Sequence, residues 1–179
     1  VHAPDEPVDL RREGVDLAVR SGHGTYPGLR SERLLPGRFA PVCSPLLKLR
    51  THADLHRHPL IRFAWRWQGA DTPDWPRWLH EAGLSSADMQ TGPLFSDETH
   101  AIQAAIAGQG VAIASLPLVA DELAHGRLVV PFGPLLDGHD FHLVWMPSSE
   151  SSDAFVRVRD WLRGEAQAFA RTHEADISR

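Results

Sequence analysis

The alternation of apolar and polar positions is clearest between Leu94 and Leu116. An apolar strand end leads to Ser96, which can cap a helix, and apolar residues then recur at helical spacing. The unbroken apolar run 111–114 is typical of a strand that is covered on both faces. Strand, helix and strand make a βαβ unit, in which ligands bind beyond the carboxyl ends of the strands. We therefore expect residues 95–99 and 115–117 to share a binding edge, although ordinary α/β core would show the same spacing.

The remaining pattern predicts a series of short helices and strands. A first helix opens at Asp5 or Pro7 and is closed by Gly14. Strands are expected at 15–19, 29–35, 39–43, 59–63, 128–130 and 141–146. Further helices are expected at 45–49, 52–58, 75–81 and 117–126, and a long one capped by Ser152 carries Phe155, Val158, Trp161, Leu162, Ala166 and Phe169 on one face. This order of elements predicts an α/β fold.

Two loops interrupt the pattern. Residues 20–28 are rich in glycine, and a later polar loop carries Trp65 and Trp67. Trp75 and Trp78 fit the buried face of the helix that follows, with the two loop tryptophans covering it. A ligand platform built from these aromatic side chains is the alternative.

Composition limits the size and class of the protein. A chain of 179 residues suffices for one domain or two small lobes, and it contains no apolar run long enough to span a membrane. The net charge of −5 and the scattered arginines differ from the basic surface of a nucleic-acid binder, so DNA contact would need another segment. A single cysteine excludes an internal disulfide and suits a reducing cytosol. The start, without Met or a secretory signal pattern, suggests a fragment or processed product.

Candidate chemistry is sparse. Cys43 precedes a short helix whose N-terminus could activate a thiolate, but no hydrolase motif accompanies it, so a buried structural cysteine is favoured. His52, His56 and His58 form one histidine run, and His139 with His142 forms a pair. Helical spacing puts His52 and His56 on one face, but no third ligand is defined for them or for the His139–His142 pair, so a solvated helix face is favoured over a metal site. The glycine loop matches no nucleotide-binding spacing. We expect no catalytic residue, no metal and no cofactor.

Five segments, taken together and in order, resemble one family. They are REGVDLAVRSGHGTYPGLRSERL, FAPVCSP, ADLHRHPLI, DETHAIQAAIAGQGVAIASLPLVADELAHGRLVVPF, and FHLVWMP followed by a terminal helix containing DWL. The chain resembles the effector-binding (substrate-binding) domain of LysR-type transcriptional regulators, most closely the branch of glycine-cleavage activators and β-lactamase-induction regulators. The resemblance covers about residues 8–165.

The resemblance implies a periplasmic-binding-protein-like fold of type 2, with two α/β lobes joined by two crossover strands and an effector in the cleft between them. Lobe I would comprise residues 1–38 and 144–179, and lobe II residues 39–143. The family's helix-turn-helix, its linker helix and the first βα unit of lobe I have no counterpart in the sequence. We therefore expect a truncated lobe I with exposed strand edges that is weakly stable or paired with another chain.

The resemblance also implies an effector site. By position, the residues are Arg20, Ser21, Gly22, His23, Phe63, Ser96, Thr99, Ser115 and His142. Members of this branch often carry Asp in place of His23 and Tyr in place of His142, so the effector can differ. Asp97 and Glu98 in the first turn of the central helix oppose a free anion. An amino acid, a sugar acid and a cell-wall peptide fragment remain open.

The function implied is that of a sensory domain without enzymatic activity. It would bind a small-molecule effector in the cytoplasm and control transcription through DNA-binding heads outside this chain, in a homodimer or homotetramer. The alternatives are a small-solute-binding protein or enzyme domain of the same fold, and a truncated gene product without function.

Overall fold

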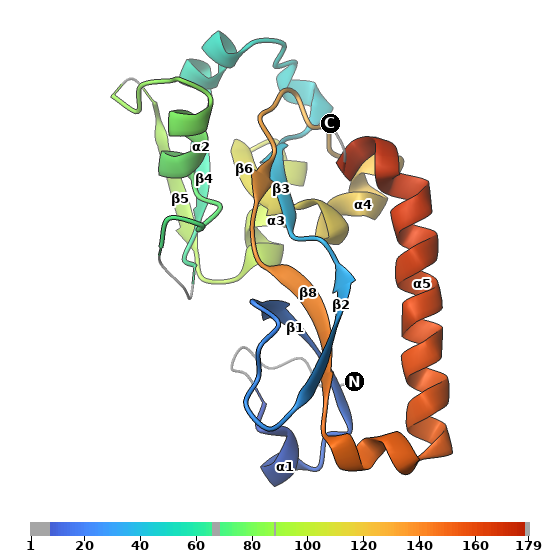
Figure 1. Ribbon diagram of the computed structural model, residues 1–179. Coiled ribbons are helices and arrows are strands. Elements are labelled where there is room, and N and C mark those ends of the chain that lie inside the picture. The colour runs from blue at the N-terminus through green and yellow to red at the C-terminus, as the bar shows by residue number, and fades with distance from the viewer. Residues whose placement is uncertain (1–7, 66–68, 88, 178–179) are drawn as a thin grey trace. The chain divides into compact units, whose positions relative to one another are not determined.

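The computed structural model describes residues 8–65, 69–87 and 89–177. Contacts divide the chain into two units (Figure 1). Unit 1 comprises Val1–Gly37 and His139–Ser178, and unit 2 comprises Arg38–Gly138. The sequence analysis grouped residues 139–143 with the second lobe, whereas the contacts group them with unit 1. In the described part of the chain, no helix combines the length and the apolar character needed to cross a membrane.

Unit 1 is built on an antiparallel three-stranded sheet. Its order is β1 (Leu17–Gly22), β8 (Asp140–Trp145), β2 (Arg30–Leu35). The unit also contains α1 (Leu10–Glu13), the 3₁₀ helix η3 (Pro147–Ser151) and α5 (Asp153–Ile177). The predicted strand 15–19 is therefore shifted, and Arg20 to Gly22 extend the strand rather than begin a loop. β1 is only half-buried, and Val19 on this sheet edge is 51% exposed.

Local capping sets the helix ends of unit 1. The Asp9 side chain accepts the N–H groups of Arg11 and Arg12, and Gly14 ends α1 in the left-handed region at φ 64°. The helix therefore begins at Leu10; Asp5 and Pro7, where the sequence placed its opening, lie outside the described residues. The Ser152 hydroxyl accepts the Phe155 N–H at 3.4 Å, which confirms the predicted cap of α5.

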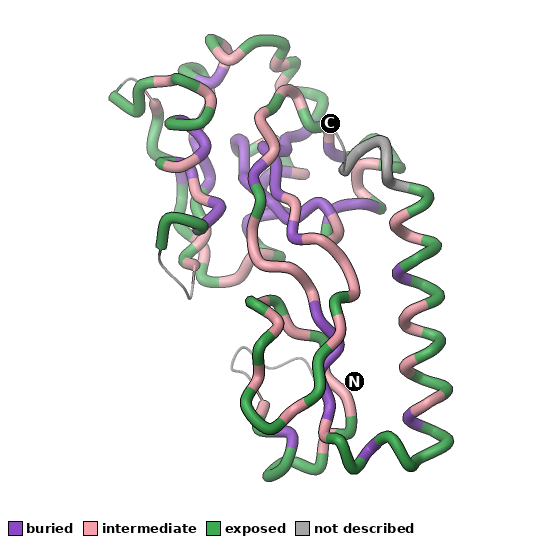
Figure 2. Tube along the Cα trace, in the orientation of Figure 1, coloured by how far each residue is buried: buried purple, intermediate pink, exposed green. Residues whose placement is uncertain are grey.

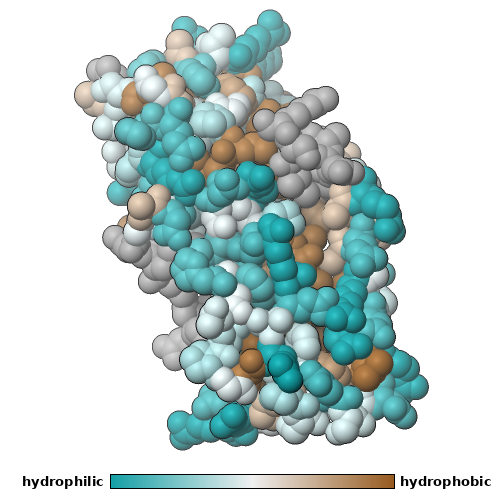
Figure 3. All heavy atoms as spheres, in the orientation of Figure 1, coloured by the Kyte–Doolittle hydropathy of each residue, from teal (hydrophilic) through white to brown (hydrophobic). Residues whose placement is uncertain are grey.

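The long helix α5 packs against the sheet through an apolar cluster and an ion pair. Phe155 packs with Leu143 and Trp145, and Arg163 Nε donates to Glu32 Oε1 at 2.7 Å. The predicted single apolar face is only partly buried, because Val158 is 47% and Trp161 60% exposed. Hydrophilic side chains cover most of the face shown in Figure 3, with hydrophobic residues in small separate patches.

Unit 2 contains a mixed five-stranded sheet. Its order is β5 (Thr91–Phe95), β4 (Leu60–Phe63), β6 (Val111–Ser115), β3 (Arg38–Val42), β7 (Leu136–Asp137). The helical segments are η1 (Pro45–Leu47), η2 (His52–Arg57), α2 (Trp75–Glu81), α3 (Glu98–Ile106) and α4 (Leu116–Ala124). β4 is parallel to β5 and to β6, so the predicted βαβ unit is confirmed with β4 between its strands. The sequence missed β7, and its strand 128–130 is only a bridge between Val129 and Cys43.

Two apolar clusters cover the faces of this sheet. Along β6, Ala112 and Ala114 belong to the cluster with α3, while Val111 and Ile113 belong to the cluster with α2. All five residues of β6 are buried, which confirms the strand predicted to be covered on both faces. Figure 2 shows that buried residues concentrate in the strands of unit 2. Trp75 and Trp78 are 6% and 0% exposed, as the buried-face interpretation predicted.

A bulge in β5 depends on Gly92. Leu60 pairs with Thr91 and Arg62 pairs with Leu94, so β5 contains one residue more than β4 over this interval. A Cβ atom on Gly92 would lie 2.5 Å from the backbone oxygen of Leu60. The neighbouring Pro93 has no N–H, which an edge strand tolerates. This bulge admits glycine and no larger residue.

We predict that Gly92→Ala lowers the free energy of unfolding by about 2 kcal/mol, because the new methyl group displaces the backbone of β4. Gly164→Ala is the matched control: it lies within α5 with no atom within 4 Å of the added Cβ. It should stabilise the chain by about 0.5–1 kcal/mol through helix propensity. Urea unfolding followed by tryptophan fluorescence measures both, and equal effects of the two substitutions would refute the steric argument.

Candidate functional site

The carboxyl ends of three parallel strands form one edge of unit 2. β4, β5 and β6 end at Phe63, Phe95 and Ser115, and α3 and α4 begin beside them (Figure 1). The Ala64 N–H donates to the Phe95 oxygen at 2.9 Å, and the Ser115 N–H donates to Glu98 Oε1 at 3.0 Å. We call Phe63, residues 96–99 and Ser115 the unit 2 edge. The structure thus brings together all four residues that the sequence placed there: Phe63, Ser96, Thr99 and Ser115.

The start of α3 differs from the prediction. The N-cap is Asp97, whose Oδ1 accepts the Thr99 N–H at 2.7 Å, whereas Ser96 is exposed and precedes the cap. Hydrogen bonding to backbone N–H, first that of Thr99, lowers the Asp97 pKa despite some desolvation. Asp97 therefore remains an anion at neutral pH.

Glu98 belongs to the unit 2 edge, although the sequence analysis did not include it among the effector-site residues. Burial raises the pKa of its carboxyl group; the hydrogen bond from the Ser115 N–H opposes this rise, and the nearby Asp97 adds to it. Ser115 is 1% exposed, and its Oγ has no hydrogen-bond partner among the described residues. Two backbone donors at this edge are thus already taken by carboxylates. The edge presents acceptors, which disfavours a free anion.

Unit 1 positions its predicted residues at the end of β1. Arg20 lies opposite His142 of β8 in the antiparallel register. Arg20 Nη2 donates to the backbone oxygen of Val8, and Ser21 Oγ donates to the His139 oxygen at 3.4 Å. We call residues 20–23, Tyr26 and His142 the unit 1 edge.

The glycine loop of unit 1 covers His142. This histidine is 8% exposed, and a Cβ atom on Gly24 would lie 2.6 Å from its Nε2. Its Nδ1 lies 3.1 Å from the Asp140 oxygen. His142 therefore lies at the expected place in the sheet but beneath the chain's own backbone.

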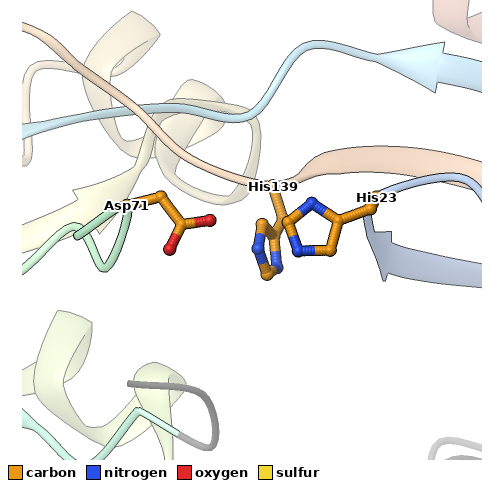
Figure 4. Close-up of side chains that lie close together, drawn as sticks. All are labelled: His23, Asp71 and His139. Atoms are coloured by element: carbon orange, nitrogen blue, oxygen red, sulfur yellow. The ribbon is translucent and has the colours of Figure 1, made fainter. Parts of the chain in front are cut away.

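The histidine sets differ from those expected. His23 and His139 of unit 1 face each other with ring centroids 4.2 Å apart (Figure 4), so His139 pairs with His23 rather than with His142. Asp71, also drawn there, belongs to unit 2. The expected alignment of His52 and His56 fails because η2 is a 3₁₀ helix, in which positions four apart point in different directions.

The tryptophan loop of unit 2 borders a cavity of about 370 Å³. Phe63, Trp65 and Trp75 are among its lining residues, and Trp75 Nε1 donates to the Ile61 oxygen at 2.8 Å. One predicted effector residue, Phe63, thus faces a cavity large enough for a small ligand. Trp67 lies outside the described residues.

Comparison with known proteins identifies the family. The family model described as the LysR substrate binding domain matches residues 1–167. The chain belongs to this family. It is therefore the ligand-sensing domain of a LysR-type regulator, and the α/β fold of two lobes predicted from the sequence is confirmed.

Named LysR relatives are transcriptional regulators. The glycine cleavage system transcriptional activator of Escherichia coli K12 is 37% identical over 174 residues, which are 94% of this chain and 55% of the relative. The regulator TrpI of Pseudomonas aeruginosa is 34% identical over 87% of this chain and 53% of its own length. The effector domain of AmpR from Pseudomonas aeruginosa superposes with a TM-score of 0.74 at 28% identity, over 93% of this chain and 80% of that structure. The chain spans about half the length of these curated relatives.

We predict that Cys43 is inert to Ellman's reagent in the folded chain. It is 0% exposed, and burial raises the pKa of its thiol to about 11, so little thiolate forms at about pH 8. In about 6 M guanidinium chloride the same thiol should react completely. Stoichiometric labelling of the folded chain at the rate of the unfolded one would contradict the structural assignment.

We predict that Glu98→Gln stabilises the chain at neutral pH and that the gain shrinks on acidification. The pKa of Glu98 in the folded chain is raised above its ordinary value of 4.5, so the folded chain holds this proton at pH values where the unfolded chain has lost it. The stability of the wild type therefore falls as the pH rises above 4.5 and through the folded-state pKa. Glutamine keeps an acceptor for the Ser115 N–H.

The control for this prediction has the opposite sign. Glu122 has its pKa lowered, first by the hydrogen bond from Arg127, so its stabilising effect is present above pH 4.5 and lost below it. Glu122→Gln should therefore slightly destabilise at neutral pH. Urea midpoints between about pH 4 and 8 test both variants, and a destabilised Glu98→Gln at neutral pH would refute the burial argument.

Proposed function

We propose that this LysR domain senses a small-molecule effector through polar residues of the unit 2 edge. The observation that carries the proposal is the unit 2 edge itself, where polar groups gather at the carboxyl ends of parallel strands. The backbone N–H of Ser115 donates to the Glu98 carboxylate there. The side-chain hydroxyl of the same serine is buried and has no partner in the described chain. Such strand ends are the usual ligand-binding place of α/β sheets.

The unit 2 edge favours a hydrogen-bond donor on the effector. The carboxylates of Asp97 and Glu98 already accept the N–H groups of Thr99 and Ser115. An ammonium, amide or hydroxyl group can use their remaining acceptor positions, whereas a carboxylate or phosphate would meet like charge. Amino acids, sugar acids and cell-wall peptide fragments carry such donors. Glycine is the first compound to test, because one relative is named a glycine cleavage system transcriptional activator.

In the complete protein, we propose that effector binding controls transcription in the cytoplasm. DNA contact would come from an N-terminal helix-turn-helix outside this chain, within a homodimer or homotetramer. An effector acts by binding one arrangement of the domain more tightly than another, which shifts the population between them.

We predict that a metabolite panel headed by glycine contains a compound that raises the melting temperature of the chain. Thr99→Ala, at the start of α3, should weaken binding of that compound about tenfold through loss of one hydrogen bond to a charged group. Isothermal titration calorimetry measures the change.

Thr172→Ala is the control, since Thr172 is an exposed residue of α5 whose hydroxyl donates to the Ala168 oxygen. Its affinity should equal that of the wild type. Undiminished binding to Thr99→Ala would remove the unit 2 edge from the effector site.

A further inference from the structure

A second cavity of unit 2 lies between α2 and the neighbouring strands β4 and β5. Its volume is about 480 Å³, which is within the range of small-molecule sites in proteins. Its lining includes Leu60 and Thr91, the first residues of β4 and β5, together with residues of α2 and of the segment that connects α2 to β5. We call it the α2–β5 cavity.

The α2–β5 cavity is separate from the unit 2 edge. β4 runs from Leu60 to Phe63 in parallel with β5, so the cavity lies at the amino ends of these strands and the unit 2 edge at their carboxyl ends. A strand rises about 3.3 Å per residue, which puts the two ends of β4 about 10 Å apart. No residue of the unit 2 edge is among the described residues that line the cavity.

Apolar side chains form much of the cavity wall. They are Leu60, Trp75, Leu79, Leu84 and Met89. Backbone hydrogen bonds hold this wall in place, since the Leu84 N–H donates to the Leu79 oxygen at 2.8 Å and the Leu60 N–H donates to the Gln90 oxygen at 2.8 Å. The cavity is therefore preformed by the fold, and it suits the apolar body of a ligand.

Arg62 supplies a positive charge to the cavity. Its Nε donates to the Gly92 oxygen at 3.3 Å. Its Nη groups have no hydrogen-bond or ion-pair partner among the described residues. The side chain is exposed and lines both the α2–β5 cavity and the tryptophan-loop cavity beside it. Arg62 can therefore pair with a carboxylate through a charged hydrogen bond.

The acidic residues at the two ends of α2 do not oppose such an anion. Asp74 accepts the Arg77 N–H at 3.0 Å, and Glu81 accepts from Arg77 Nε at 2.7 Å. Asp74 lines the tryptophan-loop cavity, whereas no acidic residue is among the described residues that line the α2–β5 cavity. The charge preference here is the opposite of that at the unit 2 edge, which presents carboxylates.

We propose that the α2–β5 cavity is a second ligand site of unit 2, which binds an amphipathic carboxylate. The apolar body of the ligand packs against the wall that contains Leu79 and Met89, and its carboxylate pairs with Arg62. The site is independent of the proposed effector site, because it lies at the other end of the strands and prefers a ligand of opposite charge.

The two methionines of the chain give a direct test of where such a ligand binds. Met89 lines the α2–β5 cavity and not the tryptophan-loop cavity, whereas Met146 belongs to unit 1. In NMR spectra of the chain with isotope-labelled methionine methyl groups, phenylacetate and octanoate are the probes, and Met89→Leu assigns the two signals. Saturable movement of the Met89 signal alone supports the proposal. A Met89 signal that neither probe moves at about 20 mM, or equal movement of both signals, overturns it.

Substitution of Arg62 tests the charge requirement. Arg62→Met should raise the dissociation constant of phenylacetate about tenfold, because it removes the hydrogen bonds to the carboxylate, and Arg62→Lys should lose less because it keeps the charge. Phenylacetamide, which has the same body without the charge, should bind equally to the wild type and to Arg62→Met. Arg57→Met is the matched control, since Arg57 is exposed on η2 and does not line the cavity. Equal affinity of the wild type and Arg62→Met for phenylacetate overturns the proposal.

Thr99→Ala separates this site from the proposed effector site. Thr99 belongs to the unit 2 edge, so its substitution should leave the dissociation constant of phenylacetate unchanged. If Thr99→Ala weakens phenylacetate as much as Arg62→Met does, the probe binds at the unit 2 edge and the second site is refuted. A metabolite whose binding depends on Thr99 and not on Arg62 supports the proposed function alone and leaves the NMR result to decide on the α2–β5 cavity.

Discussion

The burial of β6 on both faces is the constraint on which the rest of unit 2 depends. A strand without a wet side must be apolar along its whole length, and small residues such as Ala112 and Ala114 leave room for helix packing on one face. Polar groups can appear only where the strand ends. Ser115 is that end, and its N–H is satisfied by a carboxylate from the helix that begins beside it. The polar groups of the candidate site therefore lie where the buried strand β6 ends.

The sequence predicted those elements whose signal is local. The apolar run of β6, the helical spacing of α3 and the buried tryptophans of α2 were predictable, because burial of one or both faces of an element produces a regular spacing of apolar residues in the sequence. Long-range pairing has no such local signal. Arg20 to Gly22 are strand rather than loop because β8, more than a hundred residues later, supplies their partners. The cap of α3 was similarly ambiguous, since Ser96 and Asp97 are both good capping residues and tertiary contacts choose between them.

The candidate site was predictable in outline but not in its chemistry. The resemblance placed residues of both units at strand ends, and the structure brings together those assigned to unit 2. The environment of Glu98 required coordinates, because it depends on desolvation and on the Ser115 N–H, 17 positions away in the sequence.

Buried polar groups without a hydrogen-bond partner can contribute more to the binding of a ligand than polar groups that are already hydrogen-bonded within the fold. A ligand shifts an equilibrium only by its difference in affinity for the two states. When a ligand replaces an existing hydrogen bond, one bond is exchanged for another and the net gain is small. Ser115 Oγ of unit 2 and the Tyr26 hydroxyl of unit 1 have no bond to give up within the described chain, so each is an unfavourable group that a new hydrogen bond would satisfy.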